Sequence, residues 1–438
     1  MDCYKEESET AQKWVKWCHS RNLTKCVEFQ VPDGILPYKF KGILIDVKVH
    51  GTKKFSGPDD RIYSENEDLR KNVVARGNCV LELEYPLESD AGDSNSNSNK
   101  KREAIYIFLV FALRKFSGGL GDEDDSQLQN MWQKYFIKPV ESADRIVCTT
   151  KANGEAAHVS CCLIKGEYYM CFGSKNVHLL VKNKDDLLKY KDSRFEFARR
   201  VGQSFFSHSV ELMGPEKFQE LKEYLTRTRY TMICELLQPE NQHVVNLSHL
   251  EQPELQFICW AEQFQNNECS SLCAMPPDEA IEIARSYNLQ TVEYQVIPPE
   301  EAELEMAKIR SESGYEGKVL YFLDGHKNVI GLIKKKTSWY IILRAIREKA
   351  AHFTSSKNAK SVGETQKQVT KRIKDIQGWV GFSDEYRQKW NELGQGFIKW
   401  VQSKKSAGDL RAKFPPLWQQ FLDSSEQHKS IYENLQYS

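Results

Sequence analysis

The stretch Thr149-Thr150-Lys151-Ala152-Asn153-Gly154-Glu155 decides the fold. Two apolar runs flank it, 144–148 and 156–164, and both have the length and composition of strands. Asn-Gly directly after a strand is typical of a tight turn, so the sequence predicts a hairpin whose turn directs the Lys151 amine into a cleft. The alternative is an ordinary hairpin with a surface lysine.

Residues downstream of this stretch favour a chemical role for Lys151 over that of an ordinary surface lysine. They form four short motifs: Ser174-Lys175, Ile233-Cys234-Glu235-Leu236, Glu316-Gly317-Lys318-Val319 and Lys334-Lys335-Lys336. The second motif lies in an apolar run with strand character. The last two lie in runs predicted to pair with each other across Asp324-Gly-His-Lys327.

A lysine amine attacks phosphorus only when it is neutral. An ordinary lysine pKa of about 10.4 leaves roughly fewer than one amine in a thousand neutral at pH 7. Lys334 and Lys336 fall on one face of a strand, because side chains alternate along it. Nearby positive charges favour the neutral amine, so we expect these two lysines to lower the pKa of Lys151 and to neutralise phosphate oxygens. A solvated basic strand edge is the alternative.

Two glutamates and two glycines could complete a nucleotide site. The carboxylates of Glu235 and Glu316 offer hard oxygen atoms, which suit Mg²⁺ and ribose hydroxyls. Gly154 and Gly317 would let the backbone approach a nucleotide closely, although a turn glycine needs no ligand to explain it.

The order of these motifs resembles that of the covalent nucleotidyltransferases: Lys-x-x-Gly, a strand glutamate, Glu-Gly-x-Val and Lys-x-Lys. Segment 231–245 is similar to the strand-glutamate segment of fungal tRNA ligases. Segment 334–348 is similar to the Lys-x-Lys segment and following helix shared by fungal tRNA ligases and the bacteriophage RNA ligase 1 family. Upstream, Arg76-Gly77 and Lys115-Phe116 resemble the Arg-Gly and Lys-Phe-Phe-Asn signatures that precede the family's nucleophile. The resemblance covers the chain from position 70 to position 350.

By position, the resemblance implies that Lys151 is the nucleophile that takes AMP from ATP. Glu235 would hold the ribose, and Glu316 would bind Mg²⁺ or Mn²⁺. The nucleotide or the RNA end would be contacted by Arg76, Lys115, Gly154, Lys175, Gly317, Lys334 and Lys336. The chain departs from the family pattern at Ser117, where a second aromatic is expected, and at Lys318, which adds a charge.

The fold implied is α+β: a nucleotidyltransferase (ATP-grasp-like ligase) domain of antiparallel sheets with flanking helices, plus an all-helical C-terminal module. We expect an N-terminal extension at 1–70 that packs on or continues into the catalytic domain. The nucleotidyltransferase domain would span 71–349 and the helical module 350–438.

The function implied is ATP-dependent joining of an RNA 5′-phosphate to a 3′-hydroxyl, through a lysyl-AMP and an adenylylated RNA end. The RNA partners would be tRNA halves or broken RNA, in tRNA splicing or RNA repair. Two alternatives remain: a capping guanylyltransferase, which shares the lysine chemistry, and a non-catalytic RNA-binding module, which would leave the motif set unexplained.

The composition limits where an RNA-binding surface could lie and which cellular compartment fits the chain. Lys plus Arg and Asp plus Glu both number 61, so an RNA-binding surface must be a local patch. Twelve cysteines without framework spacing, no signal-like N-terminus and no membrane-length apolar run indicate a reducing compartment, cytoplasmic or nuclear, and no membrane partner. We expect a monomer.

A local basic patch in the predicted C-terminal helices could bind RNA. Lys371, Arg372 and Lys374 cluster there, with Trp379 and two further tryptophans downstream. This patch could contact an RNA backbone, or the tryptophans could be core between helices and the lysines solvated. We interpret His158 and His178, earlier in the chain, as satisfied strand residues and not as catalysts.

Overall fold

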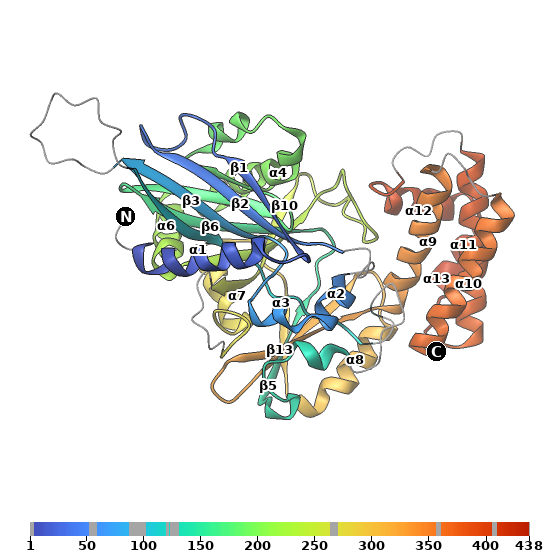
Figure 1. The fold of residues 1–438 in the computed structure, drawn as a ribbon. Coiled ribbons are helices and arrows are strands. Elements are labelled where there is room, and N and C mark those ends of the chain that lie inside the picture. The colour runs from blue at the N-terminus through green and yellow to red at the C-terminus, as the bar shows by residue number, and fades with distance from the viewer. Residues whose placement is uncertain are drawn as a thin grey trace, which may run out of the picture.

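The computed structural model describes residues 4–51, 59–86, 102–119, 122, 131–262, 270–355, 361–404 and 410–437. Over these ranges the chain forms three antiparallel sheets with flanking helices and a helical C-terminal region (Figure 1). This confirms the predicted α+β class. None of the helices in these ranges is both long and apolar enough to cross a membrane.

The first sheet is an antiparallel meander with strand order β1-β2-β3-β4. Helix α1 (Lys5–His19) covers one face of it, where Ala11 and Val15 pack against Ile45, Val80 and Phe108. Strands β2 and β3 pair along seven residues on either side of position 70, so the sheet continues across the predicted domain division there. The strands are β1 (Thr24–Gln30), β2 (Lys41–Val49), β3 (Asn78–Pro86) and β4 (Arg102–Val110).

The second sheet has the order β10-β9-β6-β7-β8. It packs against the first sheet through one apolar core, to which Leu81, Ile107, Val159 and Leu179 contribute. Helices α4 (Glu196–Ser204), α6 (Pro215–Thr228) and α7 (Pro277–Ser286) pack against it. The strands are β6 (Glu155–Ile164), β7 (Glu167–Ser174), β8 (His178–Val181), β9 (Tyr230–Leu237) and β10 (Glu254–Glu262).

The third sheet has the order β11-β5-β12-β13, and helix α8 (Ala302–Ser311) packs on it through Ile309. The predicted pairing of the last two strands is confirmed, with Gly317 opposite Lys336. The strands are β5 (Arg145–Thr150), β11 (Tyr294–Ile297), β12 (Gly317–Leu323) and β13 (Val329–Lys336).

The predicted hairpin around Lys151 is wrong. Strand β5 pairs with β11 and β12 in the third sheet, whereas β6 pairs with β7 and β9 in the second. Gly154 does not have the positive φ that the second position of a type I′ Asn-Gly turn requires. The Lys151 segment is therefore a crossing between two sheets, and it brings residues of both sheets to one place.

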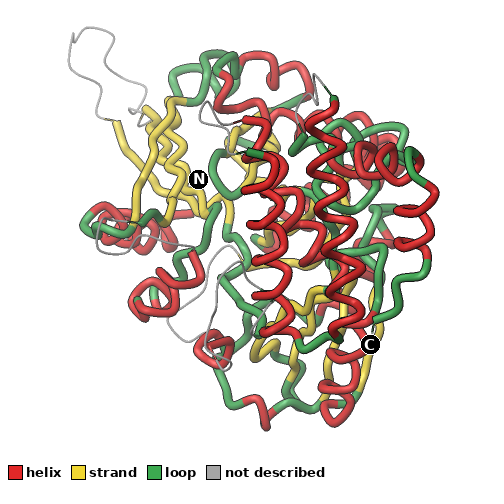
Figure 2. The backbone as a smooth tube through the Cα atoms, turned by 90° about the vertical axis from the view of Figure 1, so that its right-hand side faces the viewer, coloured by secondary structure: helices red, strands yellow, loops and turns green. Residues whose placement is uncertain are grey.

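The C-terminal helices lie together (Figures 1 and 2). They share a separate apolar core that includes Trp339, Trp390 and Leu422, and Val244 also packs into it. Figure 2 faces this helical region, with strands behind it. Its first helix runs without a break across the predicted division between 349 and 350. The helices are α9 (Ser338–Ser355), α10 (Val362–Val380), α11 (Asp384–Ser403), α12 (Phe414–Asp423) and α13 (Glu426–Glu433).

Short helical segments complete the described chain. Three are α-helical: α2 (Asp59–Glu65), α3 (Glu67–Lys71) and α5 (Val210–Met213). A π-helical segment, Phe205–Ser209, joins α4 to α5. The others are short 3-10 helices at Met131–Tyr135, Val140–Ser142, Lys184–Lys189, Ser193–Phe195 and Pro299–Glu301.

Candidate active site

Backbone contacts fix Lys151 at the crossing between the sheets. Its N–H donates to the carbonyl of Gly317 at 2.8 Å, which continues the β5–β12 pairing by one residue. Three residues later, the N–H of Gly154 donates to Oε1 of Glu235 at 3.1 Å. A Cβ on Gly154 would lie 2.2 Å from the carbonyl oxygen of Leu236, so only glycine allows the chain to pass this close to β9.

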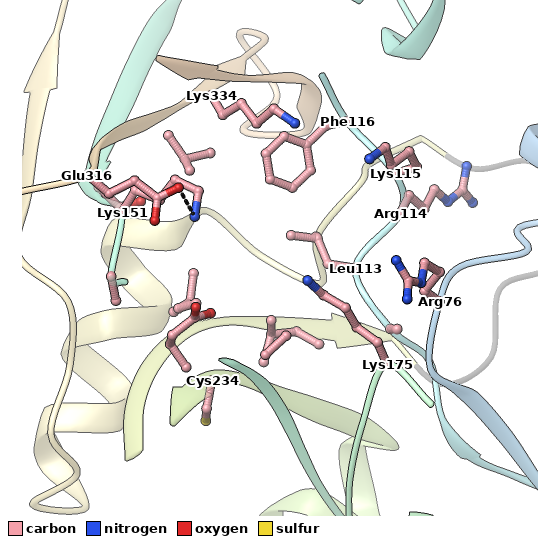
Figure 3. A pocket seen from close by; sticks show the side chains of 18 of the residues that line it. Arg76, Leu113, Arg114, Lys115, Phe116, Lys151, Lys175, Cys234, Glu316 and Lys334 are labelled. Atoms are coloured by element: carbon pink, nitrogen blue, oxygen red, sulfur yellow. Dashed lines mark ion pairs between the residues drawn. The ribbon is translucent and has the colours of Figure 1, made fainter. Parts of the chain in front are cut away.

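The amine of Lys151 forms an ion pair with a buried carboxylate. Its Nζ lies 2.9 Å from Oε1 of Glu316, as Figure 3 shows. Nδ2 of Asn153 donates to the other oxygen, Oε2, at 2.7 Å, and also to the hydroxyl of Tyr340 at 3.1 Å. Oδ1 of Asn153 accepts from the backbone N–H groups of Val244 and Val245. Asn153 therefore orients the carboxylate that holds the lysine.

A cavity of about 350 Å³ surrounds this pair. Figure 3 shows Lys334 and Phe116 along one side, and Arg76, Arg114, Lys115 and Lys175 away from the Lys151–Glu316 pair. All eight charged residues that the sequence nominated line this cavity, whereas Gly154 and Gly317 are not among its lining residues. These eight are Arg76, Lys115, Lys151, Lys175, Glu235, Glu316, Lys334 and Lys336.

Alternation along β13 separates the three lysines of the last motif. Lys334 and Lys336 line the cavity. Nζ of Lys335 instead lies 3.6 Å from Oδ2 of the buried Asp122. Lys318, the departure from the family pattern, forms a 2.7 Å ion pair with Glu305 of α8. The extra charge at Lys318 is thus neutralised outside the cavity.

The pKa of Lys151 differs in direction from the sequence-based expectation. Burial alone would lower it, but the carboxylates of Glu316 and Glu235 outweigh burial and raise the pKa of the Lys151 amine above its ordinary value. Burial lowers the pKa of Lys175, and the charge of Glu235 raises it. The neighbouring cations Lys151, Arg76 and Lys115 also lower it, so the pKa of Lys175 lies below its ordinary value. The raised pKa and the ion pair with Glu316 both favour the ammonium form of Lys151.

Several cavity residues were missed by the sequence reasoning. Arg114 lines the cavity beside Lys115, and Arg344 lines it from α9. Arg344 and Tyr340 are four residues apart on a helix, which places them on the same side of it. That spacing, directly after the Lys-x-Lys motif, was a usable signal. Asn153 was read only as a turn residue.

We expect Gly317→Ala to disturb the site through the backbone. Gly317 has a φ of +145°, and a Cβ there would lie 2.0 Å from the carbonyl oxygen of Lys335. Strain of about 1–3 kcal/mol should lower the melting temperature of the variant. The matched control is Gly325→Ala in the turn that follows β12, where nothing lies within 4 Å. Equal melting temperatures for the two variants would contradict the prediction.

Comparison with known proteins gives a family match for part of the chain. A family model described as a domain of unknown function, DUF7920, matches residues 132–347. No curated protein matches the sequence.

Solved structures similar to this chain include RNA ligases. An archaeal ATP-dependent RNA ligase is 15% identical with a TM-score of 0.46, over 97% of this chain and 81% of that one. A Naegleria gruberi RNA ligase mutant with ATP and Mn is 11% identical with a TM-score of 0.33, over 73% of this chain and 97% of that one. The same Naegleria ligase with PPi is 11% identical, with a TM-score of 0.32. Identities and scores this low leave the functional argument to the geometry of the cavity.

Proposed function

We propose that this protein is an ATP-dependent RNA ligase that works through a lysyl-AMP intermediate on Lys151. The observation that carries the proposal is the 2.9 Å pair of Lys151 with Glu316, inside a cavity lined by five further cations of the nominated set. One amine held by a carboxylate and surrounded by phosphate-binding side chains suits nucleotidyl transfer. We propose as substrates RNA with 5′-phosphate and 3′-hydroxyl ends, as in tRNA halves or broken RNA.

In the first step, Nζ of Lys151 attacks the α-phosphorus of ATP. A P–N bond forms, the bond to the bridging oxygen breaks, and pyrophosphate leaves. The amine must first lose its proton and its contact with Glu316, because the ion pair holds it charged. Lys334 and Lys336 line the cavity where they can neutralise the oxygens of the leaving group.

The two later steps reuse the same cavity. An oxygen of the RNA 5′-phosphate attacks the phosphorus of lysyl-AMP, which forms a P–O–P linkage and returns the amine to Lys151. A 3′-hydroxyl then attacks the RNA phosphorus, a phosphodiester forms, and AMP leaves. The group of Arg76, Lys115 and Lys175 at the far side of the cavity would hold the RNA phosphate.

The donor set fits a divalent cation such as Mg²⁺ or Mn²⁺. Glu316 and Glu235 both line the cavity, and the charge of each raises the pKa of the Lys151 amine. Carboxylate oxygens are the ligands that these hard cations take in proteins. Glu316 would hold the ion, which when bound would supply charge neutralisation at phosphate oxygens.

The proposal is tested by incubating the protein with ATP or GTP labelled at the α-phosphate, with Mg²⁺ or Mn²⁺, followed by a denaturing gel. We expect acid-labile label on the protein from ATP, and then transfer of the label to a 5′-phosphorylated RNA. Label from GTP alone would indicate a guanylyltransferase. No label from either nucleotide would overturn the proposal.

We expect the basic patch of α10 to support RNA joining and not adenylylation. Lys371 and Lys374 are exposed, and Arg372 lies over the ring of Trp379 at 4.7 Å. Trp390 is fully buried in the helical core, so it does not contribute to such a surface. Reversing the charge at Lys371 and Lys374 should weaken joining and make it less salt-dependent, because fewer counterions are released from RNA.

The control for this patch reverses two exposed lysines near β8, Lys184 and Lys191. Lys151 labelling by ATP should stay unchanged in both proteins. Equal joining by the patch variant and the control across a salt series would remove α10 from the RNA site.

A further inference from the structure

A second cavity lies beside the one that holds Lys151. Its volume is about 360 Å³. Tyr63, Arg114 and Lys115 line both cavities, so the two share part of their walls. Figure 3 shows Arg114 and Lys115 on the side of the first cavity that lies away from the pair of Lys151 with Glu316. A ligand held at Lys115 in the first cavity would have the second cavity as its neighbour.

The charged side chains along the second cavity are mostly basic. Glu67 is the one carboxylate among its described lining residues, and it pairs with Lys71 at 3.1 Å. Basic and acidic residues are equal in number over the whole chain, 61 each, so this excess of positive charge is local. Positive charge gathered along a cavity attracts an anionic ligand. The cations are Arg70, Lys71, Arg114, Lys115 and Lys134.

Arg70 is restrained in a position that suits a phosphate. Its Nη1 donates to the carbonyl of Tyr63, and its guanidinium carbon lies 5.8 Å from the centre of the Tyr135 ring. Tyr63 and Tyr135 are both buried, so these contacts tie the guanidinium to fixed parts of the fold. A guanidinium has five N–H donors in one plane, so its bond to Tyr63 leaves donors for phosphate oxygens.

The backbone that connects the two cavities is strained at Val73. This residue lines the second cavity and has a φ of +53°, a conformation that β-branched residues rarely adopt. Nδ2 of Asn78 donates to the Val73 carbonyl at 3.0 Å and holds this turn. Arg70 precedes the turn and lines the second cavity, whereas Arg76 follows it and lines the first. One short segment therefore supplies cations to both cavities.

Another part of the wall is fixed to the third sheet. The N–H of Ile137 donates to the carbonyl of Ile330 at 2.9 Å. Phe136 packs so closely on β13 that a Cβ on Gly331 would lie 2.2 Å from its Cδ1. Lys134 belongs to the same segment, lines the second cavity and is exposed, so it is accessible to a polyanion in solution.

The proposed chemistry indicates which anion would occupy the second cavity. We placed the RNA 5′-phosphate at Arg76, Lys115 and Lys175 in the first cavity. Along an RNA strand, the nucleotide that carries this phosphate is followed by a phosphodiester with its own negative charge. Because Lys115 lines both cavities, a strand that continues past it meets Arg114 and Arg70 next.

We propose that the second cavity binds the phosphodiester that follows the first nucleotide of the 5′-phosphorylated strand, with Arg70 and Lys134 as its ligands. This inference rests on the proposed ligase function and adds a subsite for its RNA substrate. The ligase would then bind a 5′-phosphorylated dinucleotide more tightly than a 5′-phosphorylated mononucleotide, which has no such phosphodiester.

A double variant, Arg70→Gln with Lys134→Gln, tests the subsite. Neither residue lines the first cavity. The matched control, Lys184→Gln with Lys191→Gln, removes the same charge at two exposed positions near β8. Each protein, already carrying AMP on Lys151, is mixed with a 5′-phosphorylated mono-, di- or tetranucleotide of RNA. The concentration that gives half-maximal AMP transfer is measured for each strand over a salt series.

We expect this concentration in the parent protein to be at least about tenfold lower for the dinucleotide than for the mononucleotide, as for one hydrogen bond to a charged group. The double variant should lose this gain, and its salt slope on the dinucleotide should fall by about 0.7 for the lost phosphate contact. The control should keep both. The ratio within one preparation does not depend on how much protein is folded.

A parent without the gain, or a double variant that keeps it, would overturn the inference. AMP transfer involves no 3′-hydroxyl strand. A double variant that keeps the gain in AMP transfer and is weakened only in sealing adenylylated RNA to a 3′-hydroxyl strand would assign the cavity to that strand, and would also overturn the inference.

Equilibrium binding of the same three strands, followed by fluorescence anisotropy without ATP, separates this subsite from the ligase activity. The double variant should lose the gain from mono- to dinucleotide there as well. The amount of lysyl-AMP is measured in parallel. Its absence in the parent protein would overturn the ligase proposal, whereas equal binding of the mono- and dinucleotide would overturn the subsite alone.

Discussion

A Lys151→Ala variant should form no protein–AMP adduct from ATP and should not join 5′-phosphorylated RNA. The P–N bond of the intermediate requires this amine, and alanine offers no nucleophile in its place. Labelled ATP and a denaturing gel measure the adduct directly. Labelling of the variant at the parent's level would place the nucleophile elsewhere.

Lys151→Arg serves as the matched control for charge. A guanidinium keeps a positive group beside Glu316 but stays protonated, so it cannot attack phosphorus. We expect the Arg variant to lose the adduct as completely as the Ala variant. Both variants should still seal RNA supplied with its 5′ end already adenylylated, because that step needs no bond to residue 151.

Replacing Glu316 by glutamine should reduce joining at least roughly tenfold, since one lost transition-state interaction is worth about 1.4 kcal/mol or more. Glutamine keeps the size of the side chain but removes the charge that pairs with Lys151 and that would hold a divalent cation. Labelling and joining rates across a Mg²⁺ or Mn²⁺ titration measure the effect. A variant that joins RNA at the parent's rate would exclude Glu316 from the site.

The same variant tests the ion pair through its pH dependence. Burial raises the pKa of Glu316, but Lys151 and Lys336 outweigh it and hold the pKa below the ordinary value. A depressed carboxylate pKa stabilises the fold at pH above about 4.3, and this stability is lost as pH falls through the folded-state value. The difference in unfolding free energy between parent and Gln variant should therefore shrink in acid.

Glu305→Gln is the control for this experiment. Glu305 forms a 2.7 Å ion pair with Lys318 of β12, close in length to the 2.9 Å pair of Lys151 with Glu316. Neither Glu305 nor Lys318 lines the cavity. We expect Glu305→Gln to lower stability and leave joining intact. Loss of joining in both variants would attribute the effect of Glu316→Gln to the sheet and not to the site.

Local patterns were enough to predict the pairing of β12 with β13. Alternation fixes which lysines share a face, so Lys334 and Lys336 reach the cavity while Lys335 does not. The turn after Lys151 was mistaken because Asn-Gly is a strong hairpin signal. In the structure Asn153 instead binds Glu316 and the backbone at Val244, contacts made with distant parts of the chain.

The sign of the Lys151 pKa shift could not be predicted for the same reason. The sequence shows two lysines two residues apart, but not that a carboxylate 165 positions after Lys151 closes on its amine. Distances across sheets decide which charge dominates. The contacts of Asp46 with His178, and of His178 with His158, were equally hidden, because these residues lie on three strands from two sheets.

Helix α9 limits how this protein can be cut or recombined. It begins at Ser338, two residues after Lys336. Its Arg344 lines the cavity and its Tyr340 accepts a hydrogen bond from Asn153, while Ile346 and Ala350 belong to the helical core. A truncation between 349 and 350 would divide one helix and expose that core to water. An exchange of helices α10 to α13 between related proteins would need a junction beyond Ser355, so that the whole of α9 stays with the cavity.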